Sequence, residues 1–348
     1  MTPPTSKYLT KRIFSYPCED YKILKCIGVG AFGKVHKARN LKTGHLVAIK
    51  IQDCTNDKCM ALLQEYCTND NLMDLLQECM LQERFTTKNI PKVMDKYYWS
   101  KSCTSAWSFA KVEIWTTLYM SMGSLKESQV AFVAKKVLET LLYLNQKGYV
   151  HRGIKPNNIL LTDAGEVRLV DFGLMSRIQK EKPEFIVGTP AYMAPESVLE
   201  DLSGDYDDRC DVWSLGITLL ELAEGKLPLV ISSSNSLYEY WEQKQRVPHL
   251  RKRDKWSPAF HRFLKDALTL DPAMRPSVEL LLQHEFVRNV EHEPSPLKRC
   301  LRRTHHRGST STYIPDLQET PHPSSSDSPH MPCSPSYRLA GVSEASEL

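Results

Sequence analysis

A glycine-rich stretch at residues 27–35 constrains the fold more than any other segment of the chain. It reads IGVGAFGKV, with glycines at Gly28, Gly30 and Gly33. The stretch that follows, KVHKARNLKTGHLVAIKI, alternates apolar and polar residues as strands do. The glycines therefore predict the tip of a β-hairpin, whereas the same glycines in a dinucleotide-binding fingerprint would open a helix. Backbone amides at such a tip can close over phosphates, and Lys50, seventeen residues after Gly33, is placed to pair with them.

A second group of motifs carries groups for phosphoryl transfer. The stretch HRGIKPNNIL at residues 151–160 is followed by DFG, which begins at Asp171, and by APE, whose Glu196 lies 25 residues after Asp171. Asn158 and Asp171 offer amide and carboxylate oxygens, which are the ligands that Mg²⁺ prefers. In this order, over about 250 residues, the motifs resemble those of a protein kinase catalytic domain.

This resemblance implies an α+β, bilobal protein kinase fold, with a small antiparallel-sheet N-lobe that has one main helix and a larger helical C-lobe. The expected boundaries are an N-terminal extension at 1–20, the kinase domain at 21–289 and a tail at 290–348, with the lobes meeting near residue 120. ATP and Mg²⁺ are the implied cofactors. The implied nucleotide-binding residues are Ile27, Gly28, Gly30, Ala31, Phe32, Gly33, Val35 and Lys50, and the implied metal ligands are Asn158 and Asp171.

The resemblance narrows to one family of kinases. The segments GEVRLVDFGLMSRI, GTPAYMAPE, CDVWSLGITLLELAEGKLPL and KWSPAFHRFLKDALTLDPAMRPSVELLLQHEFV look like the MAP kinase kinase kinase kinase (germinal centre kinase) family. Lys155 and the Gly-Thr-Pro motif at residues 188–190 imply Ser/Thr specificity. Glu196 and Arg275 resemble the buried ion pair of the helical lobe. Family members usually end in a citron-homology domain, and none is expected here because the chain stops at Leu348.

Gly153 is the main departure from the kinase pattern. It stands where the family has an aspartate that orients the acceptor hydroxyl and takes up its proton, and glycine can do neither. General-base catalysis contributes about 10²- to 10⁴-fold to a rate. We therefore expect slow transfer or none, although Lys50, Lys155, Asn158 and Asp171 still offer positioning and charge neutralisation.

The glutamate that should pair with Lys50 is duplicated. CTNDKCMALLQEY is followed at once by CTNDNLMDLLQEC, with nine of thirteen positions identical. Glu65 lies at the family's interval from Lys50, whereas Glu78 lies at the family's interval from the next strand. On one continuous helix the two side chains would point about 220° apart, so only one can face the cleft. We predict Glu78, because ECMLQERF keeps the apolar spacing that continues into that strand.

Two further segments differ from the family. KVEIWTTLYMSMGSLKESQVAF passes from Gly123 almost directly into a predicted helix, where the family has a hinge, a short helix and a loop. This short connection puts in question both the affinity for nucleotide and the surface on which a protein substrate would rest. In the activation segment, Phe185 replaces a phosphorylatable serine that Arg152 would normally contact once it is phosphorylated, and Glu184 is a candidate fixed negative charge in its place.

Composition and the tail limit the remaining possibilities. From about Glu291 the chain is rich in Ser, Pro and His without apolar periodicity, which predicts disorder. The net charge of +4 over 348 residues gives no argument for nucleic acid, and no apolar run is long enough to span a membrane. Ten irregularly spaced cysteines and the lack of a secretory leader predict free thiols and a cytoplasmic protein.

Two functions remain open after this comparison. The first is an ATP-binding pseudokinase, or a very weak kinase, that acts as a scaffold or allosteric partner in a MAP kinase cascade. The second is an active Ser/Thr kinase that transfers the γ-phosphate of ATP to a protein of such a cascade. Gly153, the duplicated helix and the short connection between the lobes favour the first.

Overall fold

The structure is a computed structural model, and it describes both lobes with gaps. The described residues are 19–30, 33–53, 85, 87–99, 102–108, 112–114, 123–162, 164–178, 187–199, 207–231, 233–243, 246–290 and 297. Ala31, Phe32, Glu65, Glu78, Glu184 and Phe185 lie outside them. The predicted N-lobe helix, the choice of Glu78 over Glu65 and the role of Glu184 therefore stay predictions.

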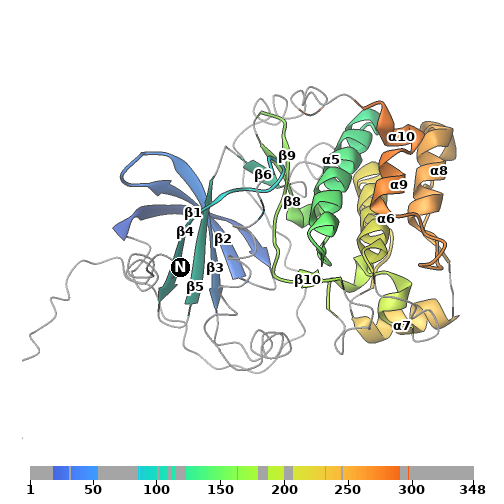
Figure 1. The fold of residues 1–348 in the computed structure, drawn as a ribbon, viewed down its shortest axis with the longest axis horizontal. Helices are drawn as coiled ribbons and strands as arrows, with labels where there is room; N and C mark the ends of the chain where they lie inside the picture. Colours follow the sequence, from blue (N-terminus) through green and yellow to red (C-terminus); the bar gives the residue numbers. More distant parts are fainter. Residues whose placement is uncertain are drawn as a thin grey trace, which may run out of the picture. The chain divides into compact units, whose positions relative to one another are not determined.

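The N-lobe is a five-stranded antiparallel sheet, as the resemblance implied (Figure 1). Its strands are β1 (Tyr21–Gly30), β2 (Gly33–Asn40), β3 (Leu46–Asp53), β4 (Val93–Trp99) and β5 (Ser102–Ser108). They lie in the order β1-β2-β3-β5-β4. Alternation along the strands separates two faces. One face buries Tyr21, Ala38, Val47 and Ile49 in a small apolar cluster, and the other carries Val35, Ala48 and Lys50.

The C-lobe is helical, as the resemblance also implied. Its helices are α5 (Glu127–Gln146), α6 (Arg209–Glu224), α7 (Ser234–Gln243), α8 (Pro258–Ala267), α9 (Val278–Leu282) and α10 (Glu285–Arg288). Helix α6 is apolar on nearly all sides, and residues 210–223 are all buried, so it forms the centre of the lobe. Among the described residues, no helix has both the length and the apolar character needed to span a bilayer.

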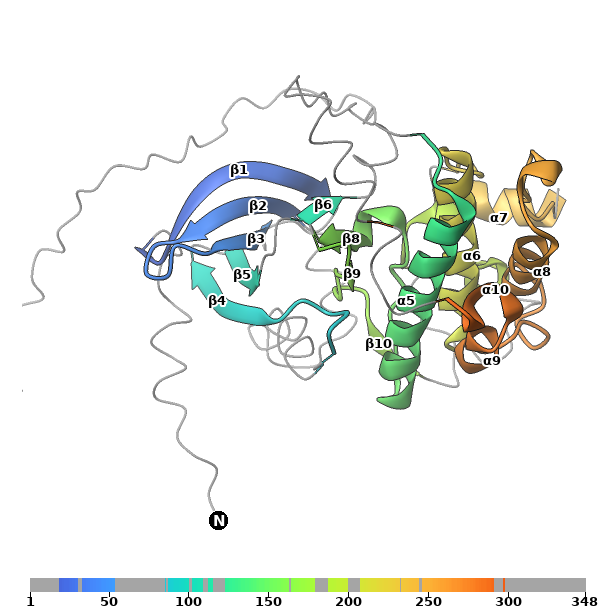
Figure 2. The ribbon, with the colours of Figure 1, turned by 90° about the horizontal axis from the view of Figure 1, so that it is seen from above.

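Short strands lie between the sheet and the helices in both views (Figure 1 and Figure 2). Strands β6 (Val112–Ile114), β8 (Ile159–Thr162) and β9 (Val167–Leu169) form a three-stranded antiparallel sheet. Strand β7 (Tyr149–Val150) pairs with β10 (Ser176–Arg177). Strands β7 and β8 flank residues 151–158, which correspond to the catalytic loop of kinases. Strands β9 and β10 flank the DFG motif, where the activation segment begins and from which it runs to Glu196.

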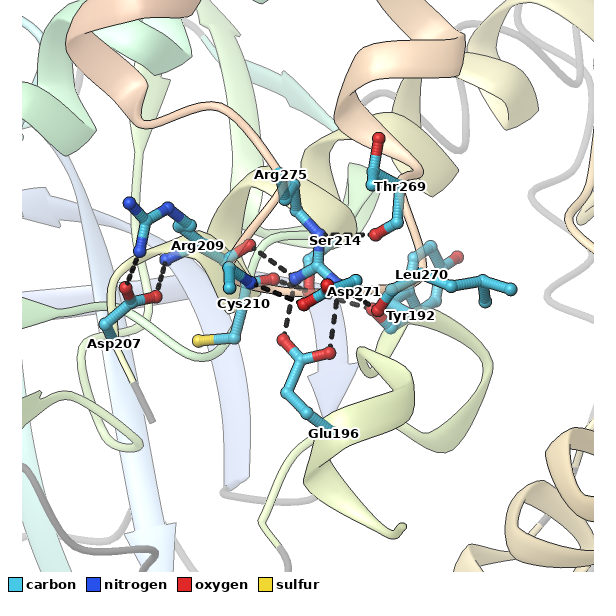
Figure 3. A network of polar contacts seen from close by, with 11 residues as sticks. Tyr192, Glu196, Asp207, Arg209, Cys210, Ser214, Thr269, Leu270, Asp271 and Arg275 are labelled. Carbon is cyan, nitrogen blue, oxygen red and sulfur yellow. Dashed lines mark hydrogen bonds and ion pairs between the residues drawn. The ribbon is translucent and has the colours of Figure 1, made fainter. Parts of the chain in front are cut away.

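The predicted ion pair between Glu196 and Arg275 is confirmed (Figure 3). The two nitrogens at the end of the guanidinium lie 2.6 and 2.9 Å from the two carboxylate oxygens, and Arg275 is only 1% exposed. Its remaining N–H groups donate to the carbonyls of Arg209, Thr269 and Leu270. All five guanidinium donors are therefore used, which is the condition under which a buried charge can be held.

The connection into α5 is short and anchored. Leu125 is buried, and its amide donates to the carbonyl of Leu222 at the end of α6 over 2.9 Å. Gly225, in the left-handed conformation with φ 70°, ends α6 beside the backbone of Ser124. Helix α5 then begins at Glu127, as the sequence predicted, with no further helix between Gly123 and α5.

The helical core extends beyond the expected end of the domain. The predicted boundary lies at residue 289, with a disordered tail after it. Leu297 is nevertheless fully buried and belongs to the apolar core of the C-lobe. This one residue of the predicted tail therefore packs on the C-lobe, and an isolated leucine among prolines and basic residues gives no periodic signal for such packing. The boundary at residue 289 stays a prediction.

Candidate functional site

Lys50 and Asp171 meet across the two lobes. The Lys50 ammonium lies 2.7 Å from Oδ1 of Asp171, and the two side chains are 6% and 21% exposed. Burial raises the pKa of Asp171, but the ammonium of Lys50 outweighs that effect, so this pKa lies below its usual range. Asp171 is therefore a stable carboxylate, as a metal ligand must be.

The backbone around Gly153 keeps its predicted neighbours close. The Asn158 amide nitrogen donates to the Gly153 carbonyl over 2.8 Å, which leaves the Asn158 oxygen available as a ligand. Lys155 donates to the Thr189 hydroxyl over 2.8 Å and so joins the loop to the Gly-Thr-Pro motif. Desolvation lowers the pKa of Lys155. Lys155 and Asn158 come from one motif and Asp171 from another, and the charge of Asp171 acts on Lys155.

No carboxylate is recorded in contact with the position of the missing base among the described residues. A Cβ built on Gly153 would lie 3.3 Å from the Asn158 amide nitrogen and from two ring atoms of His151. The Gly153 amide donates to His151 Nδ1 over 3.2 Å. An amide and an imidazole are thus the nearest neighbours of the Cβ position of this half-buried glycine, and neither of them supplies a carboxylate.

Asp211 on α6 anchors the backbone of the catalytic loop, a role that the sequence motif alone did not reveal. Its two carboxylate oxygens accept the amides of His151 and Arg152 over 2.7 and 2.8 Å. These bonds stabilise Arg152 at φ 57°, a left-handed conformation that is uncommon for a residue with a side chain. Burial raises the pKa of Asp211 to about 6.

His151 is buried against the aromatic ring of the DFG motif. Its ring lies 5.1 Å from that of Phe172 in an edge-on arrangement, and burial lowers its pKa to about 4. It is neutral at pH 7 and accepts a hydrogen bond from Gly153, so it supports the loop and carries no charge.

Arg152, in the catalytic loop, contacts the start of the activation segment. Its Nε donates to the carbonyl of Leu174 over 2.7 Å, one residue after the DFG motif, and its residue is only 6% exposed. The far end of the same segment is fixed by Thr189 and by Glu196. The segment is therefore anchored at both ends.

The hairpin aligns most of the predicted nucleotide-binding residues. Gly28 lies opposite Val35, and Gly30 lies opposite Gly33, so the glycines occupy the closed end of the β1–β2 hairpin. Val35 packs with Ala48 and Val93 on the face of the sheet that also carries Lys50. Ile27 is half-buried on β1. An apolar patch beside a lysine fits a nucleobase next to its phosphates.

The donor set also fits Mg²⁺. Asp171 supplies an ionised oxygen and Asn158 an amide oxygen, and Mg²⁺ takes one or two such ligands together with phosphate oxygens and water. The described residues contain no group of three His, Cys, Asp or Glu side chains that could hold a metal by themselves.

Comparison with known proteins agrees with this geometry. The family model for the protein kinase domain matches residues 21–287. The chain belongs to the protein kinase family. As a protein kinase, it carries a domain that in general uses ATP and Mg²⁺.

Curated relatives place this kinase domain near the predicted family. Mitogen-activated protein kinase kinase kinase kinase 3 of Homo sapiens is 36% identical over 274 residues, which cover 78% of this chain and 29% of the relative. Serine/threonine-protein kinase 10 of Xenopus tropicalis is 34% identical over 283 residues, with 79% and 28% covered. Mig-15 of Caenorhabditis elegans is 33% identical over 284 residues, with 80% and 25% covered. The chain spans less than a third of the length of these relatives.

Proposed function

We propose that this kinase domain binds Mg²⁺ and ATP but transfers phosphate slowly or not at all, and that it acts mainly as a scaffold or allosteric partner. One observation carries the proposal. The loop retains the contacts of Lys155 and Asn158, while the position that should hold the base is Gly153, whose Cβ position has Asn158 and His151 as its nearest neighbours. The chain can thus position phosphates without a group that deprotonates the acceptor alcohol.

Each remaining residue has a part in nucleotide binding. Lys50 would pair with the α and β phosphates, and Asp171 and Asn158 would hold Mg²⁺, which neutralises charge on the phosphates when bound. Lys155, fixed by Thr189, would place a positive charge near the γ-phosphate. Glu78 is the proposed partner of Lys50. Ile27, Val35 and the hairpin glycines would surround the nucleotide.

The partner class follows from the relatives. The names of the similar proteins describe a mitogen-activated protein kinase kinase kinase kinase and serine/threonine-protein kinases. We propose that the chain works in the cytoplasm with a protein of a MAP kinase cascade, holding a true kinase or altering its activity.

An active kinase is the second candidate, and one observation favours it. Lys50, Asp171, Lys155 and Asn158 are all in mutual reach, so positioning and charge neutralisation would persist without a base. Under this alternative the chain would phosphorylate Ser or Thr of a cascade protein at a low rate.

The experiment that separates these candidates restores the carboxylate. Wild type, Gly153→Asp, Gly153→Asn and Lys50→Met are compared by radiolabelled transfer from ATP to a generic basic protein substrate and to themselves. Gly153→Asn is the matched control, because it adds the same Cβ and nearly the same shape without a proton acceptor. We expect Gly153→Asp to exceed wild type and Gly153→Asn by about 10²-fold or more.

Nucleotide binding is measured in parallel by thermal shift. At a Mg-ATP concentration a hundred times its Kd, wild type should gain about 2.7 kcal/mol, and Lys50→Met should gain less. Wild-type transfer at ordinary kinase rates that Lys50→Met abolishes would favour the active kinase. No stabilisation of wild type by Mg-ATP would remove the nucleotide-binding part of the proposal.

A further inference from the structure

The loop between α7 and α8 forms an open, strongly basic hollow. It has a volume of about 700 Å³ and is lined by the seven consecutive residues His249 to Lys255. This segment holds four cationic residues and one acidic residue, a surplus of three charges, whereas the whole chain carries +4. The surplus charge of this one hollow on the C-lobe is thus nearly as large as the net charge of the whole chain.

Three of these cations have no carboxylate partner. Arg251, Lys252 and Arg253 are exposed, and no ion pair joins their side chains to any residue that the structure describes. Elsewhere on the same lobe, exposed cations do find partners, as Arg262 does with Glu285. The exposed cations of the hollow give it a surplus of positive charge over Asp254, and such a surplus favours an anionic ligand.

The hollow is built on a fixed backbone. Leu250 and Trp256 are buried on either side of it, at 1% and 6% exposure. The Arg251 amide donates to Glu224 on α6 over 3.1 Å, and the Trp256 amide donates to the Arg253 carbonyl over 3.3 Å. Because the backbone is held at both ends and in the middle, binding need not order the main chain, which lowers its entropic cost.

Lys255 links the hollow to the connection between the lobes. Its ammonium donates to the Ser124 hydroxyl over 2.8 Å and lies 4.4 Å from the Trp256 ring centre. Ser124 is in the same short segment that Leu125 fixes to the end of α6. An occupant of the hollow would therefore contact Lys255, whose hydrogen-bond partner Ser124 lies just before α5.

We propose that this hollow docks an Asp/Glu-rich segment of a partner protein. The guanidinium forks of Arg251 and Arg253 match carboxylates in bidentate geometry. The hollow is open, and its three surplus charges are fewer than the 6–10 phosphate contacts that give nucleic-acid binding its strength. The inference deepens the proposed role as a binding partner and does not depend on whether phosphotransfer survives.

The test uses the full-length chain and a fluorescent twelve-residue peptide of alternating Glu and Ser, measured by anisotropy at low and at physiological salt. Arg251→Glu/Arg253→Glu is compared with Lys147→Glu/Lys265→Glu, which makes the same change of net charge at two exposed lysines outside the hollow. We expect saturable binding that weakens with salt. The first variant should weaken it about tenfold or more and the control less than about twofold, since two charge contacts become repulsive.

Several results would overturn the proposal. They are the absence of saturable peptide binding, an equal loss in the control variant, equal binding of a peptide with Gln for Glu, and binding of phosphatidylserine vesicles or single-stranded RNA where the peptide does not bind. The Mg-ATP thermal shift is measured on the same variants and should not change. A lost peptide interaction with an intact nucleotide response, or the reverse, separates failure of this site from failure of the proposed function.

Discussion

His151 and Asp211 are adjacent buried groups whose ionisation is shifted in ways that oppose each other. Burial lowers the pKa of His151 to about 4 and raises that of Asp211 to about 6. His151 faces Gly153 and Phe172, while Asp171 and Lys155 act on its charge from the other motifs. Since the Asp211 carboxylate accepts the His151 amide, both groups stabilise the same stretch of backbone.

The two shifts have opposite effects on stability. A histidine with a lowered pKa contributes stability above its unfolded value of about 6.5, and this is lost as the pH falls toward 4. An aspartate with a raised pKa contributes stability below about 3.9, and this is lost as the pH rises through 6. Each effect is worth about 3 kcal/mol, so the two nearly cancel in the wild type between pH 6.5 and 4.

Single variants should expose these slopes. Relative to wild type, the free energy of unfolding of His151→Phe should rise by about 3 kcal/mol as the pH falls from 6.5 to 4, because the histidine term is gone. That of Asp211→Asn should fall over the same range. Urea unfolding at half-unit pH steps measures both. Parallel changes in the two variants would contradict the opposing assignment.

At the scale of elements, α6 shows packing prevailing over helix propensity. Gly216 lies in the helix interior, where alanine is favoured by about 1 kcal/mol in an exposed helix. A Cβ at this position would lie 2.7 Å from Leu268 Cδ2 and 2.9 Å from its Cγ, and Leu268 is only 2% exposed. Overpacking costs about 1–3 kcal/mol. The glycine therefore sets how closely α6 approaches the end of α8.

Gly216→Ala should consequently destabilise the protein by up to about 2 kcal/mol, opposite in sign to the prediction from propensity. In the double variant with Leu268→Ala, the two losses should sum to more than the measured loss, since the smaller side chain removes the clash. Thermal and urea unfolding of the four proteins give the coupling. A stabilised Gly216→Ala would show that the neighbours shift at little cost.

The Arg275 cluster joins the end of the activation segment to α6 and to the loop before α9. Arg275→Met should cost about 3–5 kcal/mol of unfolding free energy, because Glu196 would stay buried without its cation. Arg262→Met is the matched control, since Arg262 and Glu285 are 56% and 41% exposed and solvent screens such a pair, so that its loss should cost much less. Equal losses in denaturant titrations would argue against burial as the source of the effect.

At the scale of the whole molecule, the end of the kinase domain can be located by stability. Leu297 is fully buried, so Leu297→Ala should cost about 2–5 kcal/mol. A chain truncated after Arg299 should keep wild-type stability, whereas one truncated after Asn289 should lose about as much as the alanine variant. Calorimetry of the three proteins tests this. A chain ending at Asn289 with unchanged stability would support the predicted boundary.

The sequence predicted the fold and the approach of separate motifs because those features rest on patterns of several residues. Alternation predicted β1 to β3, and the resemblance to protein kinases implied a common site for Lys50 and Asp171 and an ion pair between Glu196 and Arg275. Isolated residues gave no such pattern, because their role depends on contacts between distant segments. Leu297, the two loop amides held by Asp211, and the basic hollow at residues 249–255 became evident only from the structure.

The contact between Lys50 and Asp171 has a consequence for the order in which ligands enter. A lone dication would encounter an ammonium group 2.7 Å from the oxygen it seeks, and at that range like charges repel strongly. A polyphosphate that travels with the dication offers the ammonium an alternative anion and so converts repulsion into exchange. Bare magnesium should thus be a poor ligand of this protein, and the nucleotide should bring its own metal.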